Sequence, residues 1–438
     1  MDMQYPQSRY REMCEQTQGG FSAWATLPCS HKRGNGMETI LAPDCFQNPA
    51  WLKSQVFSIL NFYYPRCMDD ANEGYYNCFL DDGTICDPYN KHLVSTTRFI
   101  YDFSIGLILG RQPAWYKRGL ERGIHYLQRY HLDPVNGGYY WMLRNRQVTD
   151  ATKFAYGHAF VLLAAARAAS AGFLQAERIV SYTYDVLEEH FWEPRYGLYR
   201  DQMSADWSKV SPYRGQNANM HLCEAMIAAY EATGESKYLA RAHTLAQNVT
   251  VGLASQSDGW IWENFYPDWS IDWTYIERDP FLVQFRPTGF VPGHQIEWSK
   301  LLLILDRYAH ESWMRERSDF LYRAGFSRGA DEEYGGIFYL LSPQWDVIDP
   351  RKMHWVQAEA IGASALRAVR PGSECSWETY TVMFSYCWSH LIDTVYGGWY
   401  NILSREGVRL SDVKSPLTKT DYHPISNCYE TLRALGVA

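Results

Sequence analysis

The stretch DPVNGGYYW, residues 133–141, is one copy of a glycine–aromatic pattern that recurs along the chain. Three further copies also open on an acidic residue: EPRYGLY at 193–199, DEEYGGIFY at 331–339 and DTVYGGWY at 393–400. Two shorter copies are GYY at 74–76 and GWIW at 259–262. Glycine supplies an unusual backbone angle and the aromatic residues favour extended chain, so each copy predicts a turn followed by a short strand.

The spacing of these copies defines a repeating unit of about 60 residues. Between the copies lie segments that are apolar nearly all round, which predicts buried helices at 154–169, 219–233, 294–308 and 357–369. Other segments are amphipathic and more polar, and they predict helices with one solvated face at 115–130, 176–191 and 236–249. Each unit therefore holds one buried helix, one amphipathic helix and one short aromatic hairpin.

Six such helix pairs need an arrangement in which the first and last repeats do not expose apolar surface. An open helical solenoid would require polar capping repeats at its ends, and the sequence shows none. We therefore expect an all-α fold, a single (α/α)6 barrel with short aromatic β-hairpins between its helices. The barrel is expected to span residues 46–438, with residues 1–45 as an N-terminal extension packed over it or partly disordered.

Composition excludes several classes of function. The 438 residues carry 41 Lys and Arg against 49 Asp and Glu, a net charge of −8, which argues against nucleic acid and anionic membranes as partners. No apolar run is long enough to cross a bilayer, and the N-terminus lacks the apolar core of a secretory signal. We therefore expect a cytoplasmic protein whose ten cysteines are reduced thiols. The aromatic fraction of 16% suits either a sugar-binding cleft or a large aromatic core.

The segments predicted to be buried begin with polar side chains, which are costly to bury without a function. One such residue per repeat recurs at intervals of 60 to 73 residues. In a ring of helices, equivalent positions lie close together at one end of the barrel. These residues therefore predict a pocket at that end, lined by aromatic side chains. The series comprises Arg98, His158, His221, His294, Gln357 and His423, and Asn217, Glu297 and Glu359 lie beside it.

These residue types suit proton transfer at carbon. Histidine has a pKa of about 6.5, so two opposed imidazoles can remove and return a proton next to a carbonyl, while Arg98 stabilises the developing enediolate. Glu297 lies one helical turn from His294 and would fix its tautomer. Glu224 stands in the same relation to His221, either as its partner or as an ion-pair carboxylate. No dinucleotide-binding or P-loop motif is present, so we expect no cofactor.

A bound metal is not expected either. His221, His294 and His423 offer three imidazole ligands, but the sequence has neither an HExxH motif nor clustered carboxylates.

Four motifs resemble the N-acylglucosamine 2-epimerase superfamily, whose members are (α/α)6 barrels that include sugar 2-epimerases and aldose–ketose isomerases. The resemblance covers roughly residues 48–436, and NANMH followed by PGHxxEW is most similar to the isomerase branch. The motifs are RGQNANMHLCEAMIAAYEATG at 214–234, RPTGFVPGHQIEWSKLLL at 286–303, MHWVQAEAIGA at 353–363 and DYHP at 421–424.

The resemblance implies interconversion of D-mannose and D-fructose through a cis-enediol, with a free monosaccharide as substrate. His294 and His423 would be the acid–base pair, Glu297 would orient His294, and Arg98 would bind the oxygens at C1 and C2. The remaining residues implied to hold or line the sugar are Asn217, His221, Trp298, Trp355, Gln357 and Glu359, with His158 on the same rim.

Other functions stay open at this point. Within the family they are a 2-epimerase of N-acylglucosamine or cellobiose type and a sulfoquinovose isomerase, for which Arg286 or Lys419 would either meet the anion or be plain surface cations. Outside it are a glycoside hydrolase that uses Glu297 and Glu359, and a non-catalytic sugar-binding module. The sequence does not fix the preferred sugar or the oligomeric state.

Overall fold

The structure is a computed structural model, and it describes residues 43–438 except 111–113, 372 and 374–376. Apart from its last three residues, the expected N-terminal extension, residues 1–45, lies outside the described part of the chain.

Six inner helices form a closed ring. Each contacts the next, and the last of them, α14, returns to contact the first, α4. The inner helices are α4 (Leu93–Ile108), α6 (Ala155–Ser170), α8 (Gln216–Thr233), α10 (Pro292–Ala309), α12 (His354–Ala368) and α14 (Tyr422–Ala434). Four of them, α6, α8, α10 and α12, match the segments predicted to be buried.

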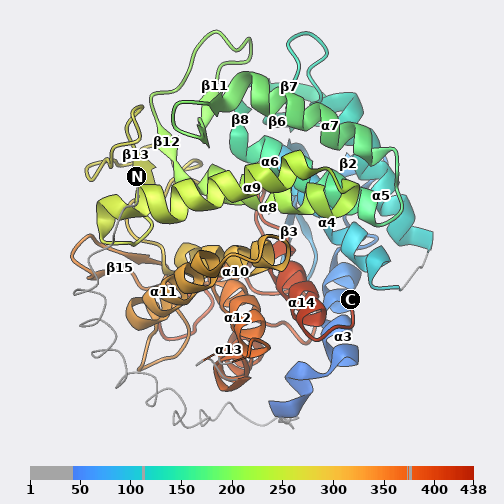
Figure 1. The fold of residues 1–438 in the computed structure, drawn as a ribbon. Helices are drawn as coiled ribbons and strands as arrows, with labels where there is room; N and C mark the ends of the chain where they lie inside the picture. The colour runs from blue at the N-terminus through green and yellow to red at the C-terminus, as the bar shows by residue number, and fades with distance from the viewer. Residues whose placement is uncertain (1–42, 111–113, 372, 374–376) are drawn as a thin grey trace.

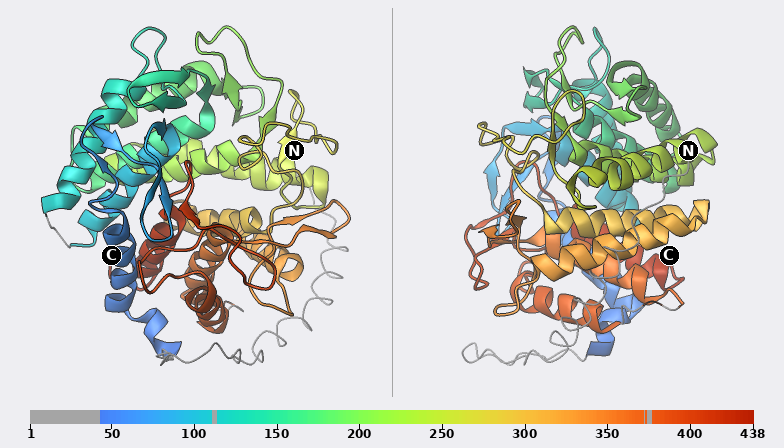
Figure 2. Two further views of the ribbon diagram at one scale, coloured as in Figure 1. Left: turned by 180° about the vertical axis from the view of Figure 1, so that it is seen from behind. Right: turned by 60° about the vertical axis from the view of Figure 1, so that its left-hand side comes forward.

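Six outer helices pack against this ring, each against an inner neighbour, and α3 bridges α14 and α4 at the closure. Figures 1 and 2 show the blue N-terminal α3 beside the red C-terminal α14. The fold is therefore the expected (α/α)6 barrel. The outer helices are α3 (Pro49–Tyr63), α5 (Ala114–Tyr126), α7 (Ala176–Val186), α9 (Ser236–Gln247), α11 (Ser312–Gly329) and α13 (Trp377–His390).

Short strands and long loops lie at one end of the barrel, on the left in the right-hand view of Figure 2. They form antiparallel pairs or three-stranded sheets. The first nine are β1 (Met68–Asp69), β2 (Gly74–Tyr75), β3 (Cys78–Leu80), β4 (Ile85–Asp87), β5 (Asn90–His92), β6 (Met142–Arg144), β7 (Gln147–Asp150), β8 (Lys153–Phe154) and β9 (Trp192–Glu193). The others are β10 (Leu198–Tyr199), β11 (Gln202–Met203), β12 (Arg214–Gly215), β13 (Asn264–Phe265), β14 (Leu340–Leu341), β15 (Val347–Asp349), β16 (Lys352–Met353), β17 (Ile402–Leu403) and β18 (Val413–Ser415).

The acidic residue at the start of a glycine–aromatic turn holds the turn in place through hydrogen bonds and an ion pair. Asp133 accepts backbone N–H groups of its own turn and binds the ammonium of Lys153 at 2.8 Å. Lys153 stands directly before α6, so the pair ties the turn to the start of the next inner helix. The same link recurs in four more repeats, as Asp69–Lys91, Glu193–Arg214, Asp331–Lys352 and Asp393–Lys414.

A second link joins the strand after the glycine to the inner helix that follows. Tyr139 donates its backbone N–H to Nε2 of His158 at 3.2 Å, and Nδ1 of His158 lies 2.8 Å from the Phe154 carbonyl oxygen. Gly138 has φ of 69° and packs so closely on His158 that a Cβ would lie 2.8 Å from Nε2. We call the helix residues that hold a hairpin in this way the anchors. They are His158, Asn219, Gln295, Gln357 and Asp421.

One sequence-based expectation is wrong: the cysteines are not all reduced. Cys78 and Cys86 form a disulfide across the β3–β4 hairpin. The other described cysteines are free thiols at 45, 67, 223, 387 and 428.

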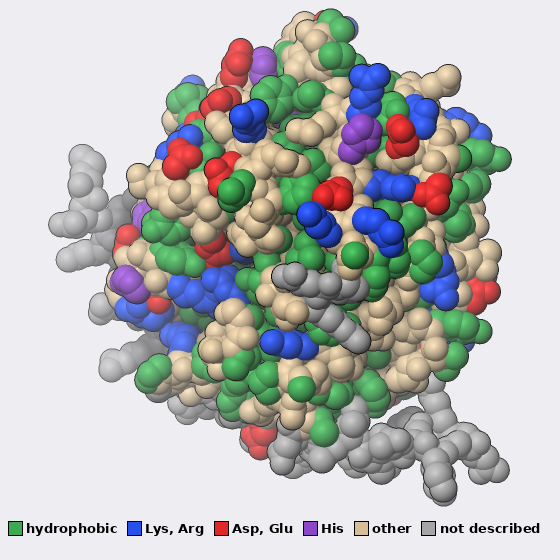
Figure 3. Space-filling view, turned by 90° about the vertical axis from the view of Figure 1, so that its right-hand side faces the viewer, with side chains coloured by type: hydrophobic (Ala, Val, Ile, Leu, Met, Phe, Trp, Pro, Cys, Tyr) green, Lys and Arg blue, Asp and Glu red, His purple; other side chains and the backbone are tan. Residues whose placement is uncertain are grey.

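No described helix is long and apolar enough to cross a membrane. On the face drawn in Figure 3, acidic and basic side chains are interspersed among hydrophobic and polar ones.

Candidate active site

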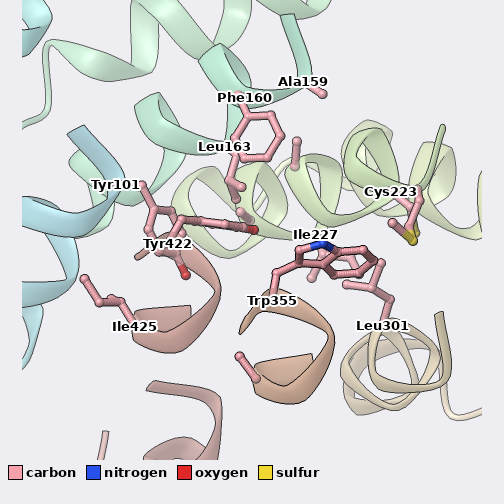
Figure 4. Close-up of a cluster of buried hydrophobic side chains, with 14 of the residues drawn as sticks. Tyr101, Ala159, Phe160, Leu163, Cys223, Ile227, Leu301, Trp355, Tyr422 and Ile425 are labelled. Atoms are coloured by element: carbon pink, nitrogen blue, oxygen red, sulfur yellow. The ribbon is translucent and has the colours of Figure 1, made fainter. Parts of the chain in front are cut away.

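The repeat brings one set of side chains to the barrel axis. The residue two positions after each anchor points into the ring, and this set comprises Phe160, His221, Glu297, Glu359 and His423. Arg98 of α4 joins them, with its guanidinium 4.4 Å from the ring centroid of Phe160 and 5.1 Å from that of Tyr422. Figure 4 shows Phe160, Tyr422 and Trp355 converging from three inner helices.

His294 is held by a chain of hydrogen bonds that starts at Trp298. The Trp298 indole N–H donates to Oε1 of Gln216 at 2.7 Å, which leaves the Gln216 amide nitrogen to donate to Glu263 at 2.9 Å. Oε1 of Glu263 lies 2.8 Å from Nδ1 of His294. Since a carboxylate only accepts, this contact places the hydrogen on Nδ1 and leaves Nε2 of His294 as the basic nitrogen.

His423 has the same arrangement. Its Nδ1 lies 2.8 Å from Oε1 of Glu359, and the other oxygen of Glu359 lies 2.5 Å from the Lys300 ammonium. Burial lowers the pKa of His423 well below its ordinary value, and the nearby charges of Arg98 and Lys419 lower it further. His423 is therefore neutral near pH 7, with Nε2 available to accept a proton.

Trp355 lies beside both imidazoles. Its ring centroid is 5.0 Å from that of His294 and 5.6 Å from that of His423. The ring of His221 lies 6.3 Å from that of His423. Burial lowers the pKa of His221 to about 4, although Glu224 opposes the change. His221 is therefore neutral near pH 7, as His423 is.

Two carboxyl groups in the site differ in their surroundings. Burial raises the pKa of Glu297 well above its ordinary value, and the neighbouring Glu359 adds to the increase. Burial acts in the same direction on Glu224, but hydrogen bonds from His221 and Tyr422 outweigh it, so the pKa of Glu224 is lowered. Glu224 is thus the partner of His221, whereas the raised pKa of Glu297 favours its neutral form.

Several buried polar atoms of the site have no hydrogen-bond partner among the described residues. They are Oε2 of Glu297, Oδ1 of Asn217 and Nε of Arg98. The amide nitrogen of Asn217 donates to the Phe285 carbonyl oxygen at 2.9 Å. Buried polar groups are nearly always hydrogen-bonded, so these atoms indicate where a polar ligand binds.

Some residues expected to contact the sugar are engaged elsewhere. The backbone bonds of the anchors occupy both ring nitrogens of His158 and both ends of the Gln357 amide. Trp298 is fully buried, and its indole N–H is taken up by Gln216. No hydrogen bond joins Glu297 to His294 in the described residues, because Glu263 takes the position expected for Glu297.

The two cations considered for an anionic substituent also differ. Arg286 is buried in ion pairs with Asp201 at 2.8 Å and Glu277 at 3.2 Å, so it is structural. Lys419 is half-buried, and its ammonium lies 5.9 Å from the Trp355 ring centroid. Lys419 therefore belongs to the site and Arg286 does not.

The fold also gathers carboxylates that are scattered in the sequence. Ligand atoms of His221, Glu224 and Glu297 lie within 4.8 Å of one another, and so do those of Glu297, Glu359 and His423. The sequence alone therefore underestimated how closely acidic groups cluster. Within these clusters, Glu359 is neutralised by Lys300, and Glu224 is held by His221 and Tyr422.

Comparison with known proteins places this arrangement in a family. Residues 74–427 match the family model described as N-acylglucosamine 2-epimerase. The chain is 42% identical over 391 residues to a D-mannose isomerase of Marinomonas mediterranea, covering 89% of this chain and 98% of that protein.

Solved structures agree with this match. A crystal structure of D-mannose isomerase superposes with a TM-score of 0.83 at 41% identity, covering 89% of this chain and 98% of that one. A cellobiose 2-epimerase from Spirochaeta thermophila shares the fold, with a TM-score of 0.78 at 23% identity over 91% of this chain and 99% of that one. The chain belongs to the N-acylglucosamine 2-epimerase family.

Proposed function

We propose that this protein is an aldose–ketose isomerase that interconverts D-mannose and D-fructose. The observation that carries the proposal is the pair of imidazoles next to Trp355, each with Nδ1 held by a glutamate. The 42% identity to a D-mannose isomerase over most of both chains supports this substrate.

The chemistry begins with an opened aldose whose C1–C2 end lies between His294 and His423. Nε2 of His294 removes the C2 proton, and the electron pair of that bond forms the C1–C2 double bond of a cis-enediol. The electrons of the C1 carbonyl move onto O1, which takes up a proton. Loss of the O2 proton, with return of a proton at C1, then gives the ketose. General acid–base catalysis of this kind typically contributes ~10²–10⁴-fold in rate.

Glu297 and Arg98 serve the oxygens of the same intermediate. In its neutral form, which its raised pKa favours, the Glu297 carboxyl group donates a hydrogen bond, and the buried Arg98 guanidinium stabilises negative charge. Trp355 offers its flat face to the C–H groups of the sugar.

Two alternative activities, a 2-epimerase and a glycoside hydrolase, differ from the isomerase in the carbon face that receives the proton and in the role of the carboxylates. Return of the proton to the opposite face of C2 gives the epimer, so a second base makes some 2-epimerase activity an expected side reaction. A glycoside hydrolase needs two carboxyl groups flanking a bond. Glu359 is instead engaged by Lys300, His423 and Asn427, which does not favour hydrolysis.

Isotope exchange tests the proposal directly. Incubation with D-mannose in deuterium oxide is expected to give D-fructose that carries deuterium at C1, together with a small amount of labelled D-glucose. Fructose without deuterium would indicate a hydride shift and would overturn the proton-transfer mechanism. Binding of mannose without any ketose product would indicate a binding module.

Substitution tests the two histidines. His294→Ala and His423→Ala are each expected to lower kcat by at least ~100-fold, while circular dichroism stays unchanged. His125→Ala is the matched control, because His125 is exposed on α5 and remote from the ring. Turnover near the wild-type rate in either site variant would remove that histidine from the mechanism.

A cytoplasmic location stays a prediction from the sequence.

A further inference from the structure

Lys419 sits on a turn whose backbone is held at almost every residue. Its own backbone N–H donates to the Pro416 carbonyl oxygen at 2.8 Å, and its carbonyl oxygen accepts from the Ser415 hydroxyl at 2.5 Å. On either side, the Thr418 carbonyl oxygen accepts from Arg98 at 3.0 Å, and the Thr420 hydroxyl donates to Asp102 at 3.0 Å. The Lys419 side chain therefore starts from a fixed position beside Arg98.

Neither Arg98 nor Lys419 forms an ion pair with a carboxylate within the described residues. The hydrogen-bond partners of Arg98 are the neutral Thr418 carbonyl and the Tyr156 hydroxyl, and it stacks over Phe160. The described hydrogen bonds and ion pairs give the Lys419 ammonium no partner, and it lies over the Trp355 ring.

The carboxylates nearby do not compensate these two cations. Glu359 is bound to Lys300, Glu224 accepts from His221 and Tyr422, and Glu297 has a raised pKa that favours its neutral form. Two neighbouring cations without an acidic partner, one of them buried and the other half-buried, attract negative charge strongly.

We propose that Lys419 is a second cationic catalytic residue, which with Arg98 forms a subsite for the oxyanion of an enediolate. This inference rests on the proposed isomerase function. When the base removes the C2 proton, the electrons of the C1 carbonyl move onto O1, which becomes negatively charged. The Lys419 ammonium donates a hydrogen bond to that oxygen and keeps its own protons. A proton then passes from the O2 hydroxyl to O1, which moves the charge to O2, and the charge disappears when the C2 carbonyl forms and C1 is protonated.

The ionisation of Lys419 gives this subsite a signature in the pH profile. Burial and the charge of Arg98 lower the pKa of Lys419 to about 7, with Glu297 acting in the opposite direction. The titratable and charged groups that face it from the inner helices are Arg98, Glu297, His354 and His423. Since only the charged ammonium stabilises the oxyanion, kcat/KM should decline as the pH rises through about 7.

The kinetic test compares Lys419→Met and Lys419→Arg with Lys209→Met, a control at an exposed surface lysine. Lys419→Met should lose 10- to 100-fold in kcat, on the order expected for a hydrogen bond to a charged group. Lys419→Arg should keep most of the activity and lose the alkaline decline near pH 7, because a guanidinium stays charged. An unchanged alkaline limb in Lys419→Arg, or wild-type kcat in Lys419→Met, would overturn the inference.

A binding test separates this inference from the proposed function. D-arabinonohydroxamate mimics the enediolate when ionised, and D-arabinonamide is its uncharged counterpart. Calorimetry should show that the wild type prefers the hydroxamate and that Lys419→Met loses this preference by about 10-fold or more while it still binds the amide. Equal loss of both ligands would point to a structural role for Lys419. A wild type that isomerises mannose while Lys419→Met keeps the preference would refute the inference alone, whereas a wild type without isomerase activity would refute the proposed function.

Discussion

Oε1 of Glu263 lies 2.8 Å from Nδ1 of His294, and this contact decides which nitrogen of the imidazole acts as the base. Glu263→Gln is expected to lower kcat by roughly 10-fold or more, a fraction of the ~10²–10⁴ that acid–base catalysis supplies, because an amide can present either a donor or an acceptor to Nδ1. KM for mannose should change little. Steady-state kinetics at several pH values measure both, with Glu121→Gln on the surface as the control. Wild-type kcat in Glu263→Gln would show that Nδ1 needs no carboxylate.

His158 and Gln357 occupy the same position in two repeats and make the same bonds. His158→Ala removes the acceptor for Tyr139 and the donor to Phe154, so it should lower the free energy of unfolding by about 2–4 kcal/mol. His158→Gln should recover most of this loss, since Gln357 already holds its hairpin with an amide. Urea unfolding measures the stability, and kcat per folded molecule should remain near wild type. Loss of activity at normal stability would instead return His158 to the sugar site.

The same residue predicts a difference in acid stability. Burial lowers the pKa of His158 to about 3, below the value of about 6.5 in an unfolded chain. A depressed histidine pKa stabilises the fold above pH 6.5, and that contribution is lost as the pH falls towards 3, by about 1.4 kcal/mol per pH unit. The stability of His158→Gln relative to wild type should therefore improve as the pH falls from 6.5 to 4.5. A relative stability that does not vary with pH would contradict a neutral, buried His158.

The Cys78–Cys86 disulfide makes a prediction that concerns the rim of the site. The β3 strand that carries Cys78 also pairs with β18, which leads into Lys419 and His423. Peptide mapping without reduction should recover the two cysteines in one linked species. Cys78→Ser with Cys86→Ser should lower the free energy of unfolding by about 2–3 kcal/mol, the scale for closing a short loop. Two separate free-thiol peptides from the wild type would rule the disulfide out.

The barrel was predictable because its signals are periodic. The glycine–aromatic copies and the apolar helices recur with one spacing, and both reflect physical needs that each repeat shares. The extra length between Gly259 and Gly336 was visible in the spacing, but the irregular segment from Tyr266 to Gly289 that causes it was not.

The site was predictable only in part, because polar residues at helix starts serve two purposes. His158 and Gln357 face the hairpins, whereas His221 and His423, two positions beyond the equivalent anchors, face the axis. A shift of two residues turns a side chain to another face of the helix, and a search for one polar residue per repeat does not separate the two sets. Glu263 was missed because it lies directly before β13, outside any helical pattern. The only signal was its place directly after the aromatic run at 259–262.

The anchors use imidazole, amide and carboxylate groups for one mechanical purpose, which has a consequence for how such enzymes diversify. A rim that is fastened separately in each repeat lets one surface loop be lengthened or exchanged while the geometry of the reacting groups stays intact. The range of substrates can then change through substitutions in the surface loops, while the residues that transfer the proton stay the same.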